Sequence, residues 1–175
     1  MPLRIAELDT AAGGRDVASD LFLSVQTKRA GKVKGEVTTA GHEEEIQLLR
    51  WNWGVSANTA IGSTERTARR AYRQLVVTKG IDAASTALLS ALATNDEIKE
   101  AVLTMRKAGG EALDYFTMTL ESARVVAVDI EVGDDGRPVE RVSIAFTKIG
   151  IAYQPQQSAG LGSGTFSFDD EVLPA

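Results

Sequence analysis

The chain has 175 residues, a formal charge of −5 and no cysteine. This length fits one domain with a single core, and the lack of thiols excludes disulfides, thiolate metal sites and a cysteine nucleophile. The negative charge argues against a general nucleic-acid binder, and no apolar run approaches the ~20 residues of a membrane helix. We therefore expect one packed domain that neither binds nucleic acid nor inserts into a membrane.

The two ends of the sequence differ in composition from the middle. Residues 1–19 are small and polar without periodicity, which predicts a flexible N-terminal arm. They contain no continuous apolar stretch of the signal-peptide type, so we expect a cytoplasmic protein that, if exported, leaves without a cleaved signal peptide. Residues 20–157 form the predicted domain. Residues 158–175 are a Gly/Ser-rich tail that we expect to lie loosely on the surface.

Two early runs have strand character. Residues 20–27 alternate apolar and polar positions, which is the period of a half-buried strand. A long Gly- and Lys-rich connection follows, and residues 45–56 then resume strand spacing. Trp51 and Trp53 share one face of this second strand, while Ile46 and Leu48 make its other face apolar. A strand that is apolar on both faces is predicted to be covered on both sides, by a helix or another subunit.

The middle of the chain contains a predicted loop and the predicted helix. Residues 57–71 show no apolar period and are expected to form a long exposed loop, followed by a strand over residues 72–80. Apolar residues at a spacing of about 3.6 predict a helix over residues 83–94. Asp82 is expected to cap its start and Asn95 to end it.

Long strands then fill the remainder of the domain, over residues 100–107, 114–132 and 140–156. In the last of these the apolar positions change from even to odd numbers without a turn, which predicts an inserted bulge residue. Long strands interrupted in this way curve and close. We therefore predict a mainly β fold: a small antiparallel β-barrel with one flanking helix and an extended loop.

The stretch "LTMRKAGGEALDYFTMTL" allows a prediction of strand register. A four-residue loop from Gly109 to Ala112 places Met105 opposite Phe116, and with it Leu103 opposite Met118, Ala101 opposite Leu120, Thr104 opposite Thr117, Arg106 opposite Tyr115 and Lys107 opposite Asp114. A phosphate-binding loop would need a helix after the glycines, whereas a strand follows.

Candidate chemistry is sparse. The single histidine, His42 in "GHEEEI", lacks a second histidine to share a metal, and we interpret it as a solvated loop residue. Asp134 and Asp135 fit a turn as well as a cation site. We predict no catalytic, cofactor or metal site.

A basic cluster, Arg66, Arg69, Arg70 and Arg73 beside Tyr72, remains. It suits an acidic surface of a partner subunit better than a nucleic acid, given the charge of the chain.

Four stretches, in order, resemble the haemolysin-coregulated protein (Hcp) family, the tube proteins of type VI secretion. They contain the W-x-W-G element at Trp51, the T-K-x-x-D element before the helix, the R-K-A-G-G-E hairpin and the Y-Q-P-Q end. The resemblance spans about residues 20–157.

The resemblance implies a structural protein rather than an enzyme. Family members form hexameric rings that stack into a tube, which a contractile sheath expels together with spike proteins and whose channel carries and chaperones effector proteins. It also implies that residues 57–69 reach a neighbouring subunit or ring. The expected interface residues are therefore Asn58, Thr59, Glu65, Arg66, Arg69 and Arg70, and Arg50 and Asn52 are expected to face the channel.

Two alternatives remain open. One is a phage-like tail-tube subunit, and the other is a monomeric β-barrel that uses its open end as a binding or catalytic module.

Overall fold

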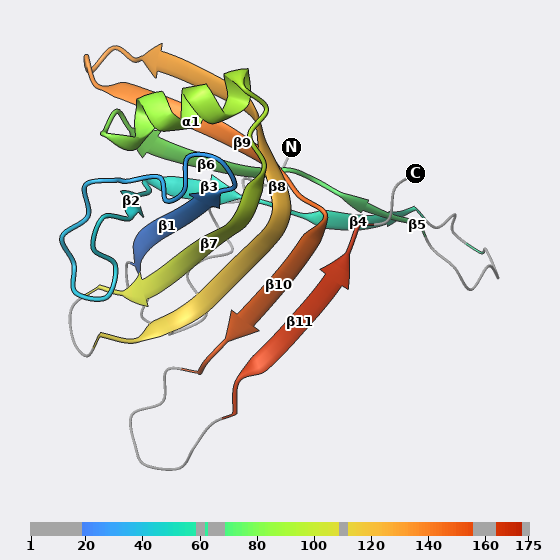
Figure 1. Ribbon diagram of the computed structural model, residues 1–175. Coiled ribbons are helices and arrows are strands. Elements are labelled where there is room, and N and C mark those ends of the chain that lie inside the picture. Colours follow the sequence, from blue (N-terminus) through green and yellow to red (C-terminus); the bar gives the residue numbers. More distant parts are fainter. Residues whose placement is uncertain (1–18, 59–61, 63–68, 109–111, 156–163, 173–175) are drawn as a thin grey trace, which may run out of the picture.

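The computed structural model describes residues 19–58, 62, 69–108, 112–155 and 164–172 (Figure 1). The chain forms a mainly β structure with one helix in these ranges, which confirms the predicted fold class. The elements are β1 (Ser19–Thr27), β2 (Ile46–Gln47), β3 (Arg50–Asn52), β4 (Val55–Asn58), β5 (Arg69–Tyr72), β6 (Leu75–Gly80), α1 (Ala84–Ala93), β7 (Ile98–Lys107), β8 (Asp114–Val132), β9 (Pro138–Ala145), β10 (Lys148–Tyr153) and β11 (Phe166–Glu171).

Nine of these strands form one strongly curved antiparallel sheet. Its order is β2-β1-β7-β8-β9-β6-β3, and β10 and β11 extend from the first half of β8. The predicted closure into a barrel is wrong for the described part of the chain, because no ladder joins the ends β2 and β3. The chain steps across the gap instead: the N–H of Leu48 donates to Leu21 O at 2.9 Å, whereas that of Leu49 donates to Thr78 O at 2.8 Å. Two consecutive residues are thus bonded to β1 and β6, the strands next to the opposite ends of the sheet.

The strand β8 links the two halves of this sheet. Its first half pairs with β7 and β10, and its second half pairs with β9. Between them Ser122 adopts a positive φ of 47°, and the register with β9 shifts between Val125 and Ala127. Such a shift bends a strand and increases its twist, so β8 can follow both halves.

The predicted single strand over residues 140–156 is in fact two strands. β9 and β10 are separated by Phe146 and Thr147, and they pair with opposite halves of β8. The change from even to odd apolar positions therefore marks this break and not a bulge. It occurs where the chain follows the bend of β8, and the N–H of Thr147 donates to Glu121 O there.

The β7–β8 hairpin confirms most of the predicted register. Met105 pairs with Phe116, Leu103 with Met118, Ala101 with Leu120 and Thr104 with Thr117. The two outermost pairs are wrong, because a register shift after Met105 places Arg106 opposite Asp114 and leaves Tyr115 out of the ladder. The Nε of Arg106 donates to Asp114 Oδ1 at 2.7 Å, and this charged hydrogen bond stabilises the shifted register. Part of the predicted turn, residues 109–111, lies outside the described residues.

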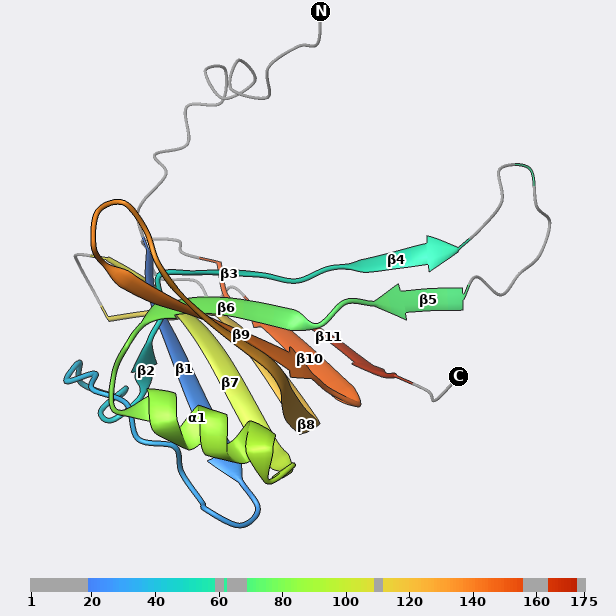
Figure 2. The same ribbon diagram turned by 90° about the horizontal axis from the view of Figure 1, so that it is seen from above.

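The helix forms where it was predicted, one residue shorter at each end, and closes the core. Its N-cap position is Ala83 and not Asp82, but Asp82 Oδ1 still accepts the N–H of Ala84 at 2.9 Å. Asn95 follows the helix with a φ of 51°. Leu88 is fully buried and packs with residues of the sheet such as Leu23 and Leu103. Figure 2 shows α1 lying along one face of the curved sheet.

A buried ion pair joins the helix to the sheet. Lys79 on β6 and Glu140 on β9 are both fully buried, and Lys79 Nζ lies 2.8 Å from Glu140 Oε2. Lys79 also lies 2.8 Å from Asp82 Oδ1, and the hydroxyl of Ser85 on α1 donates to Glu140 at 2.7 Å. The T-K-x-x-D element therefore supplies an electrostatic anchor at the start of the helix.

The C-terminal region contains a further strand. Residues 166–171, expected to lie loosely on the surface, form β11, which pairs in register with all six residues of β10. The strand covers the edge of β10. Its residues Phe166 and Phe168 lie opposite Tyr153 and Ile151 and so continue the apolar face of β10.

Candidate functional site

The most prominent surface feature is a two-stranded projection formed by β4 and β5, which we call the arm. Its strands pair with each other through Val55–Tyr72, Ser56–Ala71, Ala57–Arg70 and Asn58–Arg69, and they form a sheet separate from the main one. Figures 1 and 2 show the arm extending well beyond the body of the molecule. The expectation of a loop over residues 57–71 is therefore wrong at its two ends, which form strands. Their apolar period is missing because no core covers the arm.

The base of the arm is held by backbone and aromatic contacts. The N–H of Arg73 donates to Gly54 O at 2.9 Å, where the two strands leave the body. A Cβ at Gly54 would lie 2.3 Å from Nη2 of Arg73, so glycine lets this side chain pack against the chain. Trp53 stacks on Tyr72 with ring centroids 6.2 Å apart, and Tyr72 meets the ring of Phe146 edge-on. These contacts explain why W-x-W-G stands at the root of the arm.

Asp170 on β11 ties the arm to the sheet. Its carboxylate accepts a hydrogen bond from the Tyr72 hydroxyl and pairs with Arg70 Nη1 at 3.1 Å. The bond from Tyr72, with Arg70 nearby, lowers the pKa of Asp170, while burial and the same carboxylate raise the pKa of Tyr72. The direction in which the arm leaves the body thus depends on the C-terminal strand.

The predicted interface residues belong to the arm strands or to the segment between them in the sequence. Arg70 is exposed and held as described. Asn58 and Arg69 lie at the ends of β4 and β5, but their side chains lie outside the described part of the structure. Thr59, Glu65 and Arg66 lie outside the described residues altogether. The structure therefore brings Asn58, Arg69 and Arg70 together in the arm strands and tests none of them as an interface.

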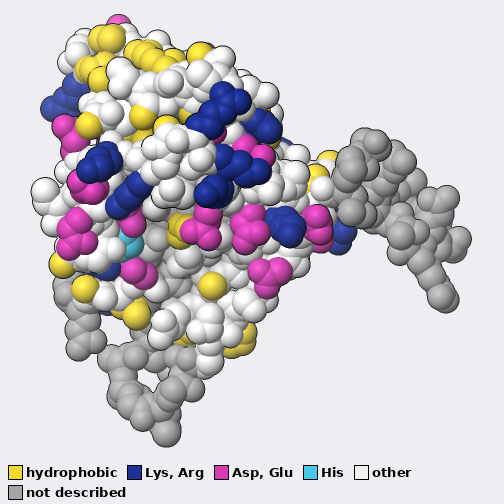
Figure 3. Space-filling model, viewed as in Figure 1, with side chains coloured by type: hydrophobic (Ala, Val, Ile, Leu, Met, Phe, Trp, Pro, Cys, Tyr) yellow, Lys and Arg dark blue, Asp and Glu magenta, His cyan; other side chains and the backbone are white. Residues whose placement is uncertain are grey.

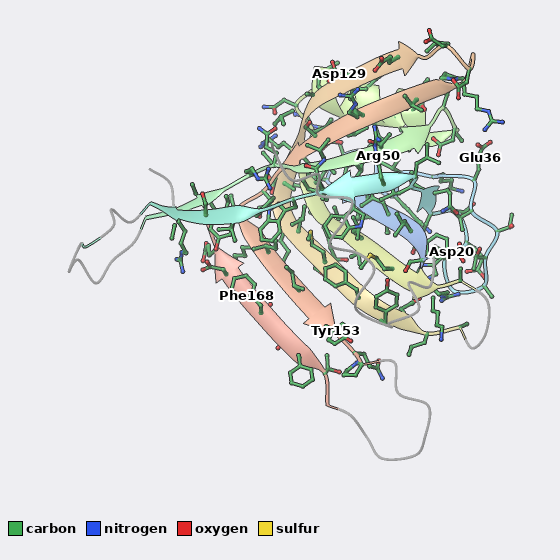
Figure 4. All side chains as sticks on the ribbon, turned by 180° about the vertical axis from the view of Figure 1, so that it is seen from behind. Asp20, Glu36, Arg50, Asp129, Tyr153 and Phe168 are labelled. Carbon is green, nitrogen blue, oxygen red and sulfur yellow. The ribbon has the colours of Figure 1, made fainter. Side chains whose placement is uncertain are left out.

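Arg50 and Asn52 lie on β3 and are exposed (Figure 4 labels Arg50). Between them Trp51 turns to the opposite side and stacks on Phe116, with ring centroids 5.7 Å apart. The face that carries Arg50 continues across three more strands as Thr78, Arg141 and Asp129, which are paired in one row. This row is polar from end to end, in contrast to the core on the other side.

An exposed apolar surface lies at the far end of β8. Ile130 and Val132 are 55% and 62% exposed, and Leu89 on α1 is 39% exposed. Hydrophobic side chains gather in the corresponding region at the top of Figure 3. Neighbouring exposed side chains of this kind often mark contact surfaces.

His42, interpreted from the sequence as a solvated loop residue, is in fact buried. Its ring stacks on Phe22 at 4.3 Å, Nδ1 lies 2.8 Å from Glu45 Oε2, and Nε2 lies 3.1 Å from Asp114. Asp114 also accepts a hydrogen bond from Arg106. Burial alone would raise the pKa of Asp114, but the bonds from Arg106 and His42 outweigh it and lower the pKa. The network fastens the connection after β1 to the β7–β8 hairpin. No group of ligating residues suited to a metal ion occurs among the described side chains.

Comparison with known proteins assigns the chain to a family. The family model described as "Type VI secretion system effector, Hcp" matches residues 22–153. Protein hcp1 of Pseudomonas aeruginosa is 33% identical over 152 residues, which cover 85% of this chain and 91% of that protein. The chain belongs to the Hcp family.

Solved structures agree with this assignment. A type VI secretion system effector from Yersinia pestis is 28% identical with a TM-score of 0.71, covering 87% of this chain and 100% of that one. Hcp1 from Salmonella typhimurium is 26% identical with a TM-score of 0.68, covering 88% and 94%. Hcp is a family of secreted tube proteins of type VI secretion, not a family of enzymes.

The residues that sequence reasoning missed in this Hcp fold are Asp170, His42 and Glu140. Only Asp170 left a local signal, since Phe166, Phe168 and Asp170 alternate along a strand with Ser167 and Asp169. The partners of His42 and Glu140 are distant in sequence. The one helix that the described ranges contain, α1, is too short to cross a membrane.

Proposed function

We propose that the chain is the structural subunit of the type VI secretion inner tube. Six copies close into a ring around a wide channel, and the rings stack into a tube that a contractile sheath expels behind its spike proteins. The channel carries and chaperones effector proteins. The subunit has no catalytic role, and it passes from the cytoplasm out of the cell without a cleaved signal peptide.

The observation that carries this proposal is the arm in an Hcp fold. The arm is a two-stranded projection with no core of its own, so most of its backbone and side chains are exposed in the single subunit. Contact with a neighbouring copy would cover this surface. Charged and polar groups for that contact come from Arg70, from Asn58 and Arg69 of the arm strands, and from Thr59, Glu65 and Arg66 between those strands in the sequence. The exposed apolar end of β8 offers a second surface for a ring neighbour.

The polar row on β3, β6, β9 and β8 supports the assignment of the channel wall. Arg50 and Asn52 belong to this face, which is rich in polar side chains and turned away from the core. A channel filled with water and passing cargo requires such a lining. We propose that Arg50 and Asn52 face it.

Mass and imaging test the assembly. Light scattering behind size exclusion should give a mass near six times 18.7 kDa, and electron microscopy should show rings. A monomer at high protein concentration would contradict the proposal.

The arm is tested separately by charge reversal. Arg66→Glu with Arg69→Glu should abolish stacking or ring closure, as read by native mass spectrometry and electron microscopy. Arg137→Glu with Lys34→Glu, at exposed positions outside the arm, changes the net charge equally and should leave both intact. Unchanged assembly in the arm variant would exclude these arginines from the interface. Arg70→Glu is examined on its own, because it also faces Asp170 within the subunit.

A further inference from the structure

The outer edge of β11 is open in the described structure. β11 pairs with β10 alone, so the backbone groups on its other side join no ladder among the described strands. Figures 1 and 4 show it at the margin of the sheet. Edge strands are usually protected by charged side chains, especially lysine, by proline or by a bulge. The sequence of β11, FSFDDE, contains no lysine or proline, and its register with β10 is unbroken, so its carboxylates are its only protection of this kind. Carboxylates repel an acidic strand but attract a cationic one, and the edge is therefore suited to a strand that carries cationic side chains.

The two faces of β11 have different chemistry. On one face Phe166 is 65% exposed and Phe168 is 46% exposed, and Tyr153 of β10 lies beside them (Figure 4). On the other face are Ser167, Asp169 and Glu171, all exposed. An incoming strand would thus meet aromatic rings on one side and carboxylates on the other.

A trough of about 690 Å³ runs along the acidic face. Gly150 and Ala152 of β10 form its floor, and the strands on either side supply its walls. Asp169 leans over Gly150, where a Cβ would lie 2.7 Å from its Oδ1. The small residues of β10 therefore leave room for long side chains that reach the carboxylates.

The charges select the class of partner. Asp170 is neutralised by Arg70. The lining of the trough also includes Glu121 and one cation, Lys148, which lies opposite Glu171 in the register. Lys148 forms no ion pair with a described carboxylate, so the carboxylates of Asp169 and Glu171 stay unpaired among the described side chains and the lining keeps a negative charge. Two unpaired carboxylates beside an open edge repel an acidic strand and attract a cationic one. The aromatic face favours apolar side chains at the alternate positions.

We propose that β11 is a docking edge for an extended segment of a partner protein in which cationic and apolar residues alternate. The segment adds to the sheet by backbone hydrogen bonds with β11. Its cationic side chains lie over Asp169 and Glu171, and its apolar side chains cover Phe166 and Phe168. We take the occupant to be a different protein, and pairing with a second copy of this chain is an outcome that the test below detects.

The test uses a fluorescein-labelled, capped octapeptide of alternating lysine and valine, measured by fluorescence anisotropy on the full chain. It should bind at least about tenfold more tightly than the same peptide with glutamate in place of lysine. The double variant Asp169→Lys with Glu171→Lys should invert this preference. The control Glu36→Lys with Asp134→Lys changes the net charge equally at exposed positions far from β11 and should preserve it.

Hydrogen exchange locates the contact. The lysine peptide should slow exchange of the amides of residues 166–171, and a peptide with a central proline should not, because proline cannot complete the ladder. A preference that the double reversal leaves unchanged, or slowed exchange elsewhere only, would overturn the proposal. Slow amide exchange of β11 in the chain without peptide, caused by self-association through this edge, would also overturn the proposal. Ring formation is read by mass and docking by anisotropy, so the failure of one is distinguishable from the failure of the other.

Discussion

Replacing Lys79 by methionine should be among the most destabilising single changes in this chain. Lys79 and Glu140 are fully buried, with Nζ and Oε2 2.8 Å apart. Without Lys79, the Glu140 carboxylate keeps only the hydroxyl of Ser85, and its Oε1 has no partner among the described residues even in the native chain. Removing one member of a buried pair costs about 3–5 kcal/mol, because the other charge remains buried without compensation. We expect Lys79→Met to lower the free energy of unfolding by this amount.

The reverse change should cost less, because the cluster is asymmetric. In Glu140→Gln the ammonium of Lys79 keeps Asp82 at 2.8 Å, Ser85 at 3.0 Å and the carbonyl oxygen of Gly80 at 2.9 Å. The expected loss is that of one charged hydrogen bond, about 1.5–3 kcal/mol. The double variant Lys79→Met with Glu140→Leu removes both charges, and the single variant Glu140→Leu closes the cycle. The loss of the double variant should be well below the summed losses of Lys79→Met and Glu140→Leu, since apolar replacements of buried pairs are often close to neutral.

Urea unfolding followed by fluorescence of Trp51 and Trp53 measures these differences. All variants are compared at one protein concentration and neutral pH, because self-association adds to apparent stability. Lys148→Met, at an exposed lysine of β10, is the matched control and should change the free energy of unfolding by no more than about 0.5 kcal/mol. The reasoning is refuted if Lys79→Met costs no more than this control. It is also refuted if the double variant loses the full sum of the single changes.

Three further predictions concern the arm, the hairpin network and the bend in β8. Asp170→Ala should speed hydrogen exchange in residues 69–72, because the arm loses its contacts with β11. The control Asp169→Ala should leave that exchange unchanged. Equal exchange rates in the two variants would show that Asp170 does not hold the arm. The pKa of Asp114 is lowered in the fold, so its contribution to stability is present above the ordinary carboxyl pKa of about 4 and is lost as the pH falls through the folded value. The stability difference between the native chain and Asp114→Asn, measured by urea unfolding, should therefore be constant near neutrality and shrink below about pH 4; a difference that grows on acidification would contradict this sign. Ser122 has a φ of 47°, a conformation that glycine adopts without strain and a β-branched residue does not. In scanning calorimetry, Ser122→Gly should therefore raise the melting temperature, and Ser122→Val should lower it with a destabilisation of about 1–2 kcal/mol. The opposite order would show that the bend does not require this backbone conformation.

The parts of the fold that the sequence predicted well depend on local periodicity. The helix at residues 83–94 and the pairing of Met105 with Phe116 follow from spacing alone, since one side of each element must be buried. The register shift at Tyr115 could not be predicted in this way. It arises from the contacts of Asp114 with Arg106 and with His42, and His42 lies 72 residues away in the sequence.

The remaining differences have similar causes. The arm shows no apolar period because its strands pair with each other away from the core. The sequence does not reveal that the sheet stays open between β2 and β3. At this place the chain crosses from one side of the gap to the other through the N–H groups of Leu48 and Leu49, whose acceptors lie on strands far apart in the sequence. β11 was overlooked because its alternation of Phe166 and Phe168 covers few residues and follows a Gly/Ser-rich stretch. Of the candidate site, the position of Arg50 and Asn52 opposite Trp51 followed from strand parity, whereas the tie from Arg70 to Asp170 joins residues 100 apart.

The continuity of β8 has a mechanical consequence. Its 19 residues run without interruption from the β10 side of the sheet to the β9 side. A thrust on one half of the subunit is therefore transmitted to the other through covalent bonds and not across a seam between separate sheets. Antiparallel hydrogen bonds lie perpendicular to the strands, so a pull along β8 loads many of them in shear at once. The subunit should resist a pull along β8 as one unit and yield first at the base of the arm, where the Arg73–Gly54 backbone hydrogen bond and side-chain contacts take the place of a continuous ladder.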